Sequence, residues 1–344
     1  LWGGCSGDAQ DAPDAGGVVR PPRLSAPGCT SPAEAPFRAE DGGHHCAPVG
    51  ASTTAAANEW PDTTGAAEPV VYVRAGSTGT GARDAPFGDL GAALRASPAA
   101  RTVVLARGTH PLTATQSLNR TVTIVGAGPS DTRLVAPPAM SALAVQATAS
   151  AVVVTLVGVS VRYEAPPSGA STPAALAVTG GQAHLQLREV VIEQPGRGVA
   201  VTEGATLCAE RLTVIRATDT GVQLQAGAHA YLKNVAVRES GGAGVSAGRS
   251  HVVLDASFVA SNRHDGVSIV GAVTGGACRT DAECAAAPAC EGFLTGLSHA
   301  RSCVALSATG ATPSVCASVD ELRDVVLRGN TVTGLRAQRA RPTD

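Results

Sequence analysis

The pair His264-Asp265 is the strongest candidate in the sequence for acid–base chemistry. An imidazole beside a carboxylate can accept and return a proton near neutral pH. The pair also stands directly before Gly266, and Asp before Gly is typical of a turn. Ser250-His251 supplies a hydroxyl and an imidazole, but no carboxylate stands at a spacing that would complete a triad. A catalytic role and a purely structural turn therefore both remain as interpretations of His264 and Asp265.

Two other motifs suggest binding chemistry and favour simpler interpretations. His44-His45 stands beside Cys46, but no second cluster stands at ligand spacing, so we expect a solvated loop and no metal. The stretch VTIVGAGPSD, Val122–Asp131, is similar to a dinucleotide fingerprint, which requires Gly or Ala where Asp131 stands. The residues after it are β-branched or proline, so we predict a strand that ends in a glycine turn. No cofactor is expected, and Ca²⁺ would be expected only if the chain were a lyase.

Nine cysteines favour an oxidising compartment. Gly3-Gly4-Cys5, followed by an Asp/Ala/Gly-rich run, resembles the end of a bacterial lipoprotein signal, whose cysteine becomes lipidated. This resemblance implies an extracellular or outer-membrane surface location with a lipid anchor at Cys5; the alternative is a disulfide cysteine in a secreted protein. The remaining disulfide candidates are Cys29, Cys46, Cys208, Cys278, Cys284, Cys290, Cys303 and Cys316.

The composition favours a narrow repeat protein over a compact globule. The chain of 344 residues is 44% hydrophobic but only 3% aromatic, with 40 glycines and 22 prolines. Small aliphatic residues stack well in a solenoid, where each repeat contacts only its neighbours. A net charge of −2 gives no electrostatic footprint for nucleic acid or for an anionic membrane. We therefore expect no nucleic-acid partner, no membrane contact except through the lipid anchor, and a monomer.

Two independent markers repeat along the chain with steps of 22 or 23 residues. The first is a short alternating apolar strand at 175, 198, 221, 244 and 266, led by glycine in the last four. The second is a spaced apolar triplet that begins at Leu187, Ala209, Leu232 and Leu254. Alternation turns one side of each strand inward, and stacking these sides between rungs builds a continuous core. The pattern predicts a parallel β-solenoid that begins near Val70, after a tether over residues 1–68.

The beginning of the ordered region carries a more specific pattern. Its residues are Tyr72-Val73, Gly79, Gly81, Pro86-Phe87, Leu90, Ala93-Leu94, Val103–Leu105, Gly108, Val122–Ile124 and Gly126. The pattern resembles the N-terminal entry of the pectate-lyase-like β-helix superfamily, and the resemblance covers most of residues 70–335. It implies an all-β, right-handed parallel β-helix over residues 69–344, with a capping helix near Pro86–Ala96. Lyases of this superfamily use clustered acidic residues for Ca²⁺ with an Arg or Lys base, and its hydrolases group several Asp residues.

Two interruptions break the period. The step from Leu156 to Leu187 is 31 residues, and the surplus falls in a loop at Tyr163–Pro173. The step from Gly266 to Gly334 is 68 residues, which leaves an insertion near 272–317 with five cysteines. Their wide spacing favours a disulfide-stapled loop over a zinc site. Five cysteines need an outside partner, and Cys208 is expected to point outward and to supply it. Such an insertion resembles those of delta-proteobacterial surface proteins.

Outward charges of the repeats alternate in sign down one column: Arg188, Glu210, Lys233, Asp255 and, after the insertion, Arg323. Opposite charges on neighbouring strands stabilise a sheet, whereas a catalytic site would concentrate like charges. Asn262 and Asn330, with Ser240 at the matching position, resemble the asparagine ladder of parallel β-helices. We interpret both columns as structural.

Three hypotheses for function remain. The first is a surface-anchored or secreted, non-enzymatic β-helix protein that binds carbohydrate or another cell-surface partner through a solenoid face. The second is a polysaccharide lyase or glycoside hydrolase of the pectate-lyase-like superfamily. The third is a structural spacer. The sequence favours the first, because it combines a tether, a rigid rod and an insertion without clustered acids.

Overall fold

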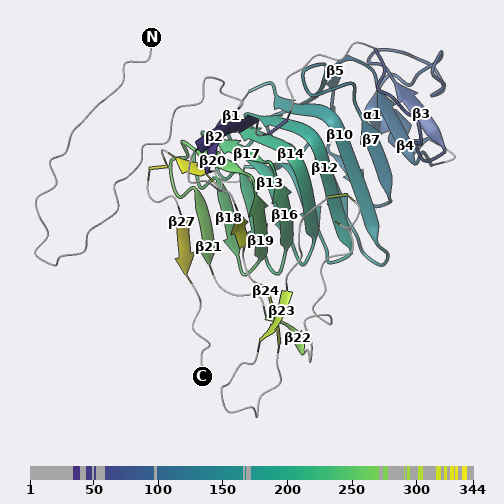
Figure 1. The fold of residues 1–344 in the computed structure, drawn as a ribbon. Helices are drawn as coiled ribbons and strands as arrows, with labels where there is room; N and C mark the ends of the chain where they lie inside the picture. Colours follow the sequence, from purple (N-terminus) through teal and green to yellow (C-terminus); the bar gives the residue numbers. More distant parts are fainter. Residues whose placement is uncertain are drawn as a thin grey trace, which may run out of the picture.

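The chain forms an all-β, right-handed parallel β-helix, which is visible as stacked rungs in the computed structural model (Figure 1). The description covers residues 34–38, 44–48, 50–51, 59–96, 99–165, 167, 172–270, 274–277, 290, 293–294, 301–304, 315–318, 321–323, 326–328, 330–331 and 335–338. The predicted fold class is confirmed.

One long parallel sheet holds one strand of each rung, and shorter strands continue it around a corner of the solenoid. In chain order its main strands are β3 (Val70–Val73), β4 (Thr102–Leu105), β7 (Val122–Val125), β10 (Val152–Tyr163), β12 (Ala183–Glu193), β14 (Thr206–Ile215), β16 (His229–Lys233), β19 (His251–Asp255) and β25 (Glu321–Arg323). The strands beyond the corner are β5 (Gly108–Pro111), β8 (Thr132–Ala136), β17 (Ala236–Arg238), β20 (Phe258–Ala260) and β26 (Val326–Arg328).

A second parallel sheet is built from the first sequence marker. Its strands are β6 (Gln116–Leu118), β9 (Leu143–Gln146), β11 (Ala174–Thr179), β13 (Arg197–Thr202), β15 (Val222–Gln225), β18 (Val245–Gly248), β21 (Val267–Val270) and β27 (Leu335–Gln338). Both interruptions are confirmed by the register, because Leu156 pairs with Leu187 and Val267 pairs with Leu335.

The corner between the two parts of the long sheet requires a left-handed backbone residue in successive rungs. Gly158 occupies it with φ of 63°, and later rungs place Glu189, Arg211, Asn234 and Ala256 there with φ between 46° and 57°. Side chains other than glycine pay a steric cost in this region. At this corner the Glu189 carboxylate lies 2.6 Å from the Arg211 guanidinium. Two residues in this left-handed conformation on neighbouring rungs thus form an ion pair.

The core consists of inward columns that run along the rod. One column stacks five residues that are all 0% exposed, and complete burial of a leucine or valine side chain stabilises a fold by about 1.5–3 kcal/mol. The five are Leu156, Leu187, Ala209, Leu232 and Leu254. Each rung is thus held by the rungs on either side.

A short helix closes the first rungs, but it begins later than predicted. Helix α1 spans Leu90–Arg95, and the Asp89 carboxylate caps it by accepting a hydrogen bond of 2.7 Å from the Ala92 N–H. Pro86 lies outside the helix, and Phe87 instead forms a β-bridge with Val73. The predicted start near Pro86 was wrong because bridge pairing to β3 competes with helix formation at Phe87. Leu90 and Ala93 are buried in the core.

The predicted asparagine ladder is confirmed. The buried Asn262 side chain accepts a hydrogen bond from the Ser240 N–H (2.9 Å), and its amide donates to Asn330 Oδ1 (2.9 Å). The Asn330 amide in turn donates to the Val259 carbonyl oxygen at 3.2 Å. The ladder bridges the 68-residue step, so the rung after the insertion stacks directly on the rung before it.

Part of the predicted tether is ordered. Strands β1 (Glu34–Arg38) and β2 (His44–Pro48) form an antiparallel pair. The Ala51 N–H donates to Thr213 Oγ1 at 2.9 Å, and Trp60 is buried against β3 and β4. The interpretation of 1–68 as an unstructured tether therefore does not hold for these residues, since β1 and β2 pair with each other and Ala51 and Trp60 contact the solenoid.

Candidate functional site

The predicted catalytic pair lies in the turn between β20 and β21. His264 is exposed and Asp265 is buried. The His264 N–H donates to the Gly242 carbonyl at 3.3 Å, and the Asp265 carbonyl accepts from the Gly244 N–H at 3.0 Å. The backbone of both residues thus joins stacked turns. Among the residues that the structure describes, no group of three or more His, Cys, Asp or Glu side chains could hold a metal ion.

The outer surface of the long sheet carries the functional candidates, arranged in columns. One column passes from Thr102 through Thr123 and Thr155 to Gln186 and Cys208. Thr123, Thr155 and Gln186 are half-buried, and Thr155 Oγ1 donates to Gln186 Oε1 at 2.8 Å. Neighbouring rungs lie about 4.8 Å apart. The column therefore offers a regular row of uncharged hydrogen-bonding groups.

The first end of this surface is covered by an aromatic pair. Trp60 packs edge-on against Tyr72 with ring centroids 5.2 Å apart, and both contact the outward Val104. The Arg74 guanidinium lies 5.4 Å from the Trp60 ring centroid. Outward side chains of β3 and β4 are therefore packed under the segment that leads into the solenoid.

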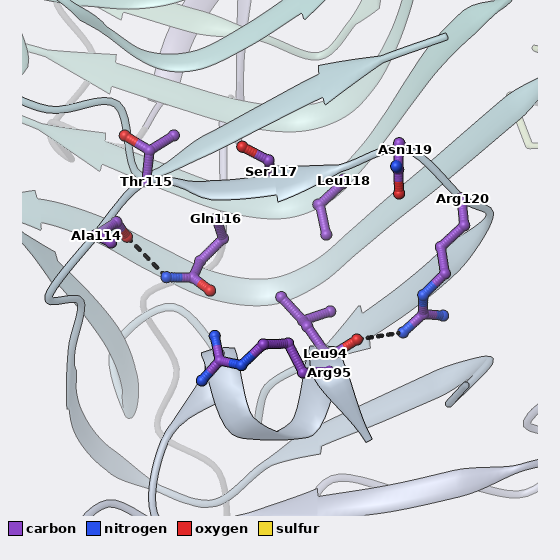
Figure 2. A pocket seen from close by; sticks show the side chains of 10 residues that line it. Leu94, Arg95, Ala114, Thr115, Gln116, Ser117, Leu118, Asn119 and Arg120 are labelled. Carbon is purple, nitrogen blue, oxygen red and sulfur yellow. Dashed lines mark hydrogen bonds between the residues drawn. The ribbon is translucent and has the colours of Figure 1, made fainter. Parts of the chain in front are cut away.

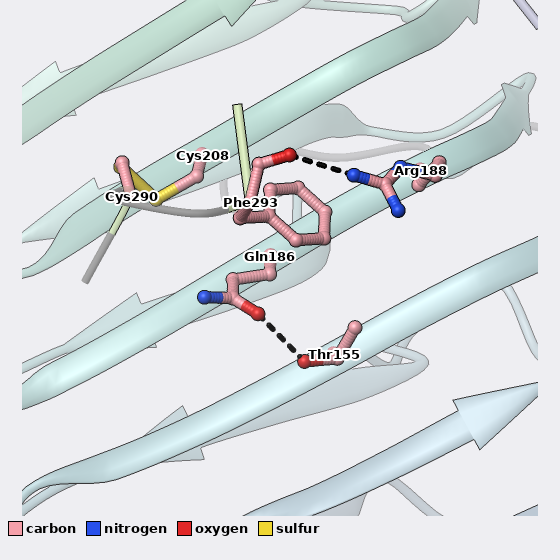
Figure 3. Close-up of a disulfide and its surroundings, with 6 residues drawn as sticks. All are labelled: Thr155, Gln186, Arg188, Cys208, Cys290 and Phe293. Atoms are coloured by element: carbon pink, nitrogen blue, oxygen red, sulfur yellow. Dashed lines mark hydrogen bonds between the residues drawn. A yellow bond between two sulfur atoms is a disulfide. The ribbon is translucent and has the colours of Figure 1, made fainter. Parts of the chain in front are cut away.

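The other end is covered by the insertion, which a disulfide joins to β14 (Figure 3). Cys208 points outward, as predicted, and bonds to Cys290, 82 residues later in the chain. Cys208, Tyr231 and Val253 form a second, outer core with residues of the insertion. We call these three residues the covered face. It is sealed by Cys290, Phe293 and Leu294.

Between the two covers lie β7, β10 and β12. The outward side chains that these strands carry before the corner are all half-buried. We call six of them the open face: Thr123, Val125, Thr155, Val157, His184 and Gln186.

The alternating charge column begins at the border of the two faces. Its predicted register is confirmed in every rung from Arg188 to Arg323. Arg188 donates to Glu210 at 2.9 Å and to the Phe293 carbonyl at 2.6 Å, and its guanidinium lies 4.5 Å from the Phe293 ring centroid. Arg188 thus contacts both the insertion and the rung that contains Glu210.

A third outward column contains three histidines, including His251 of the Ser250-His251 pair, whose alignment the sequence reasoning missed. His184, Thr206, His229 and His251 are stacked in register. The His229 and His251 ring centroids are 6.0 Å apart. Burial lowers the pKa of His184, so its imidazole is neutral at neutral pH. The column is detectable in the sequence, because its members follow the steps of 22, 23 and 22 residues of the second marker.

The cysteine predictions divide into two groups. Cys46 and the pair Cys208–Cys290 are disulfide-bonded. In the insertion, β22 (Thr274–Ala277), β23 (Arg301–Val304) and β24 (Val315–Ser318) form an antiparallel sheet in which Cys303 lies opposite Cys316. Cys5, Cys29, Cys278 and Cys284 lie outside the described residues.

Comparisons with known proteins add little to this description. No family model matches the chain, and no curated protein matches its sequence. The catalytic domain of a GH87 alpha-1,3-glucanase in complex with nigerose has a TM-score of 0.30 and 11% identity, over 86% of this chain and 70% of that chain. The same domain with the substitution D1068A, in complex with tetrasaccharides, has a TM-score of 0.29. In the described residues, no helix has the length and apolarity to cross a membrane.

Proposed function

We propose that this protein is a non-enzymatic β-helix scaffold that binds an extended carbohydrate on its open face. The observation that carries the proposal is the uncharged polar column Thr123–Thr155–Gln186, left between two covered stretches of the same sheet. Threonine hydroxyls and a glutamine amide can each donate and accept hydrogen bonds, as sugar hydroxyls do. A column of like groups at rung spacing suits a ligand that is itself a repeat.

The neighbouring columns support the same ligand class. Val125 and Val157 lie half-buried on one side of the polar column, and the neutral His184 lies on the other. Ligand sites combine apolar contact area with a few placed polar groups. The open face carries no carboxylate in its six residues, which favours binding over acid–base chemistry.

The site of action follows from the disulfides. Structural disulfides persist in oxidising compartments. The bonds at Cys46 and at Cys208–Cys290 therefore support a role outside the cytoplasm. Lipid anchoring at Cys5 and a relation to delta-proteobacterial surface proteins remain part of the proposal, and palmitate labelling of the full-length protein with and without Cys5→Ala tests the anchor.

A binding experiment tests the open face. Wild-type protein and a Thr123→Val, Thr155→Val variant are compared by affinity electrophoresis in a panel of neutral and acidic polysaccharides. We expect at least one polysaccharide to retard the wild type, and the variant to lose about tenfold in affinity because two hydrogen-bonding groups are removed. The matched control is Thr179→Val, whose hydroxyl lies 3.3 Å from Thr202 Oγ1 on the second sheet.

Three outcomes would contradict the proposal. The first is the absence of retardation by any polysaccharide, and the second is equal retardation of the wild type and the double variant. The third is the release of reducing or unsaturated ends during incubation, which would establish an enzyme instead.

A further inference from the structure

A pocket of about 350 Å³ lies at the first rung of the solenoid, away from the open face (Figure 2). Helix α1 forms one wall with Gly91, Leu94 and Arg95. The other wall runs from Ala114 to Arg120 and includes β6, the first strand of the second sheet in chain order and one of its two edges. The pocket is therefore enclosed by the cap on one side and by a sheet edge on the other.

A polar side chain of the pocket lies at the end of an otherwise aliphatic column of the core. Gln116 heads an inward column whose other members are aliphatic: Leu143, Leu176, Val199, Val222, Val245 and Val267. The Gln116 amide nitrogen donates to the Ala114 carbonyl at 2.7 Å. This bond fixes the side chain and leaves Oε1 as an acceptor on the pocket side, as Figure 2 shows.

A guanidinium converges on the same space. A Cβ on Gly91 would lie 3.0 Å from Arg95 Nη1 and 3.1 Å from both Gln116 Oε1 and Asp89 Oδ1. Glycine inside a helix costs roughly 1 kcal/mol relative to alanine. The glycine thus keeps room between a cation and a hydrogen-bond acceptor. No ion pair of Arg95 is found among the described residues, and the Asp89 carboxylate beside the same point is already engaged, because it accepts a hydrogen bond from the Ala92 N–H.

The sheet edge supplies a donor as well. In a parallel sheet, the N–H and C=O groups of one residue point to the same side of the strand, and those of the next residue point to the opposite side. The Gln116 N–H donates to Ala142 on the β9 side, so the N–H of Ser117 is directed to the other side, where the pocket lies. Arg120 is already engaged, because it donates to the carbonyl oxygens of Leu94 (3.0 Å) and Ala100. Arg120 closes the pocket and leaves Arg95 as its available cation.

We infer that this pocket binds a small hydroxylated carboxylate about the size of a monosaccharide. The carboxylate pairs with the Arg95 guanidinium and accepts from the Ser117 N–H, and a ligand hydroxyl donates to Gln116 Oε1. Charge-assisted hydrogen bonds of this kind are roughly twice as strong as neutral ones. This second site is independent of the proposed function, since it shares no residue with the open face.

Isothermal titration of the intact protein tests the pocket with D-gluconate, D-glucose, acetate and inorganic phosphate as probes. We expect gluconate to bind at least about fivefold more tightly than each of the other three, because only gluconate supplies both the carboxylate and the hydroxyls. Absence of saturable gluconate binding would overturn the inference. Equal affinity for phosphate or acetate would overturn its hydroxyl component, and equal affinity for glucose would overturn its carboxylate component.

Two variants locate the site. Arg95→Gln is expected to weaken gluconate binding about tenfold, whereas Arg83→Gln, an exposed arginine outside the pocket, changes it less than about twofold. Gln116→Leu extends the aliphatic column and should preserve the melting temperature while reducing the affinity for gluconate to that for acetate. Unchanged gluconate binding in both Arg95→Gln and Gln116→Leu would place the ligand elsewhere and overturn the inference.

Discussion

The covered face and the open face are outward surfaces of one sheet, built on the same rungs, and they differ in what lies above them. Under the insertion, Tyr231 is 1% exposed and Val253 is 3% exposed, as deeply buried as residues inside the rod. Three and four strands from Tyr231, Thr155 and Thr123 stay half-buried. The inward columns of this β-helix are mostly apolar, whereas the character of each outward column depends on what covers it locally. Outward columns are therefore where sequence changes can alter function without altering the fold.

The largest effect is expected from releasing the cover. A Cys208→Ala, Cys290→Ala variant loses a crosslink that spans 82 residues, and chain entropy assigns such a crosslink about 4 kcal/mol. The free energy of unfolding, measured with urea, should fall by about that amount. Dye binding to exposed apolar surface should rise, because the covered face becomes accessible.

If the two faces are independent, loss of the disulfide should change the stability of the protein but not its affinity for polysaccharide. The double cysteine variant should keep the polysaccharide affinity of the wild type, since only Gln186 of the six residues of the open face lies next to Cys208 in the register. Loss of both stability and binding would mean that the two faces form one site.

The next effect is a matched pair of truncations, one on each face. Tyr231→Ala removes a buried aromatic side chain, and such changes cost about 3–5 kcal/mol. Thr155→Ala removes a half-buried hydroxyl and its bond to Gln186, for which about 1 kcal/mol is expected. Urea denaturation of the two variants measures the difference. Equal losses would show that the open face is also packed as core.

Residue periodicity predicts which residues stack in a column, but it does not predict which segments of the chain cover the outward columns. Alternation on either side of Leu207 and Ala209 predicts that Cys208 points outward, and the steps of 22 and 23 residues predict which charges stack. The choice of Cys290 among five cysteines depends on how the insertion folds back, which no local pattern encodes. Trp60 is a similar case, because its burial against Val104 joins segments 44 residues apart in a stretch that reads as linker.

Local competition explains the remaining differences. Phe87 has helical spacing to Leu90 and Leu94, yet the edge of β3 offers it backbone bonds. A local sequence pattern does not indicate whether Phe87 forms a helical turn or a β-bridge, because the bridge partner Val73 lies 14 residues away.

The smallest effect concerns protons at the border of the two faces. Burial lowers the pKa of His184, and it also lowers that of His110, which is buried on β5 near the start of the rod. A histidine whose pKa is lower in the folded than in the unfolded protein destabilises the fold when it is protonated. The stability that these residues contribute is therefore complete above the unfolded pKa of about 6.5 and declines as the pH falls from there toward the folded pKa.

Urea denaturation between pH 7.5 and pH 5 measures this decline. We expect His184→Gln and His110→Gln each to flatten the wild-type curve, with the larger change for His110, since that imidazole is the more deeply buried. The His110 variant serves as a control because it lies far from the insertion. If the cover desolvates the border, combining His184→Gln with the Cys208→Ala, Cys290→Ala variant should give no further flattening. An additive effect would mean that the rung of His184 itself desolvates the imidazole. The insertion would then not influence the open face.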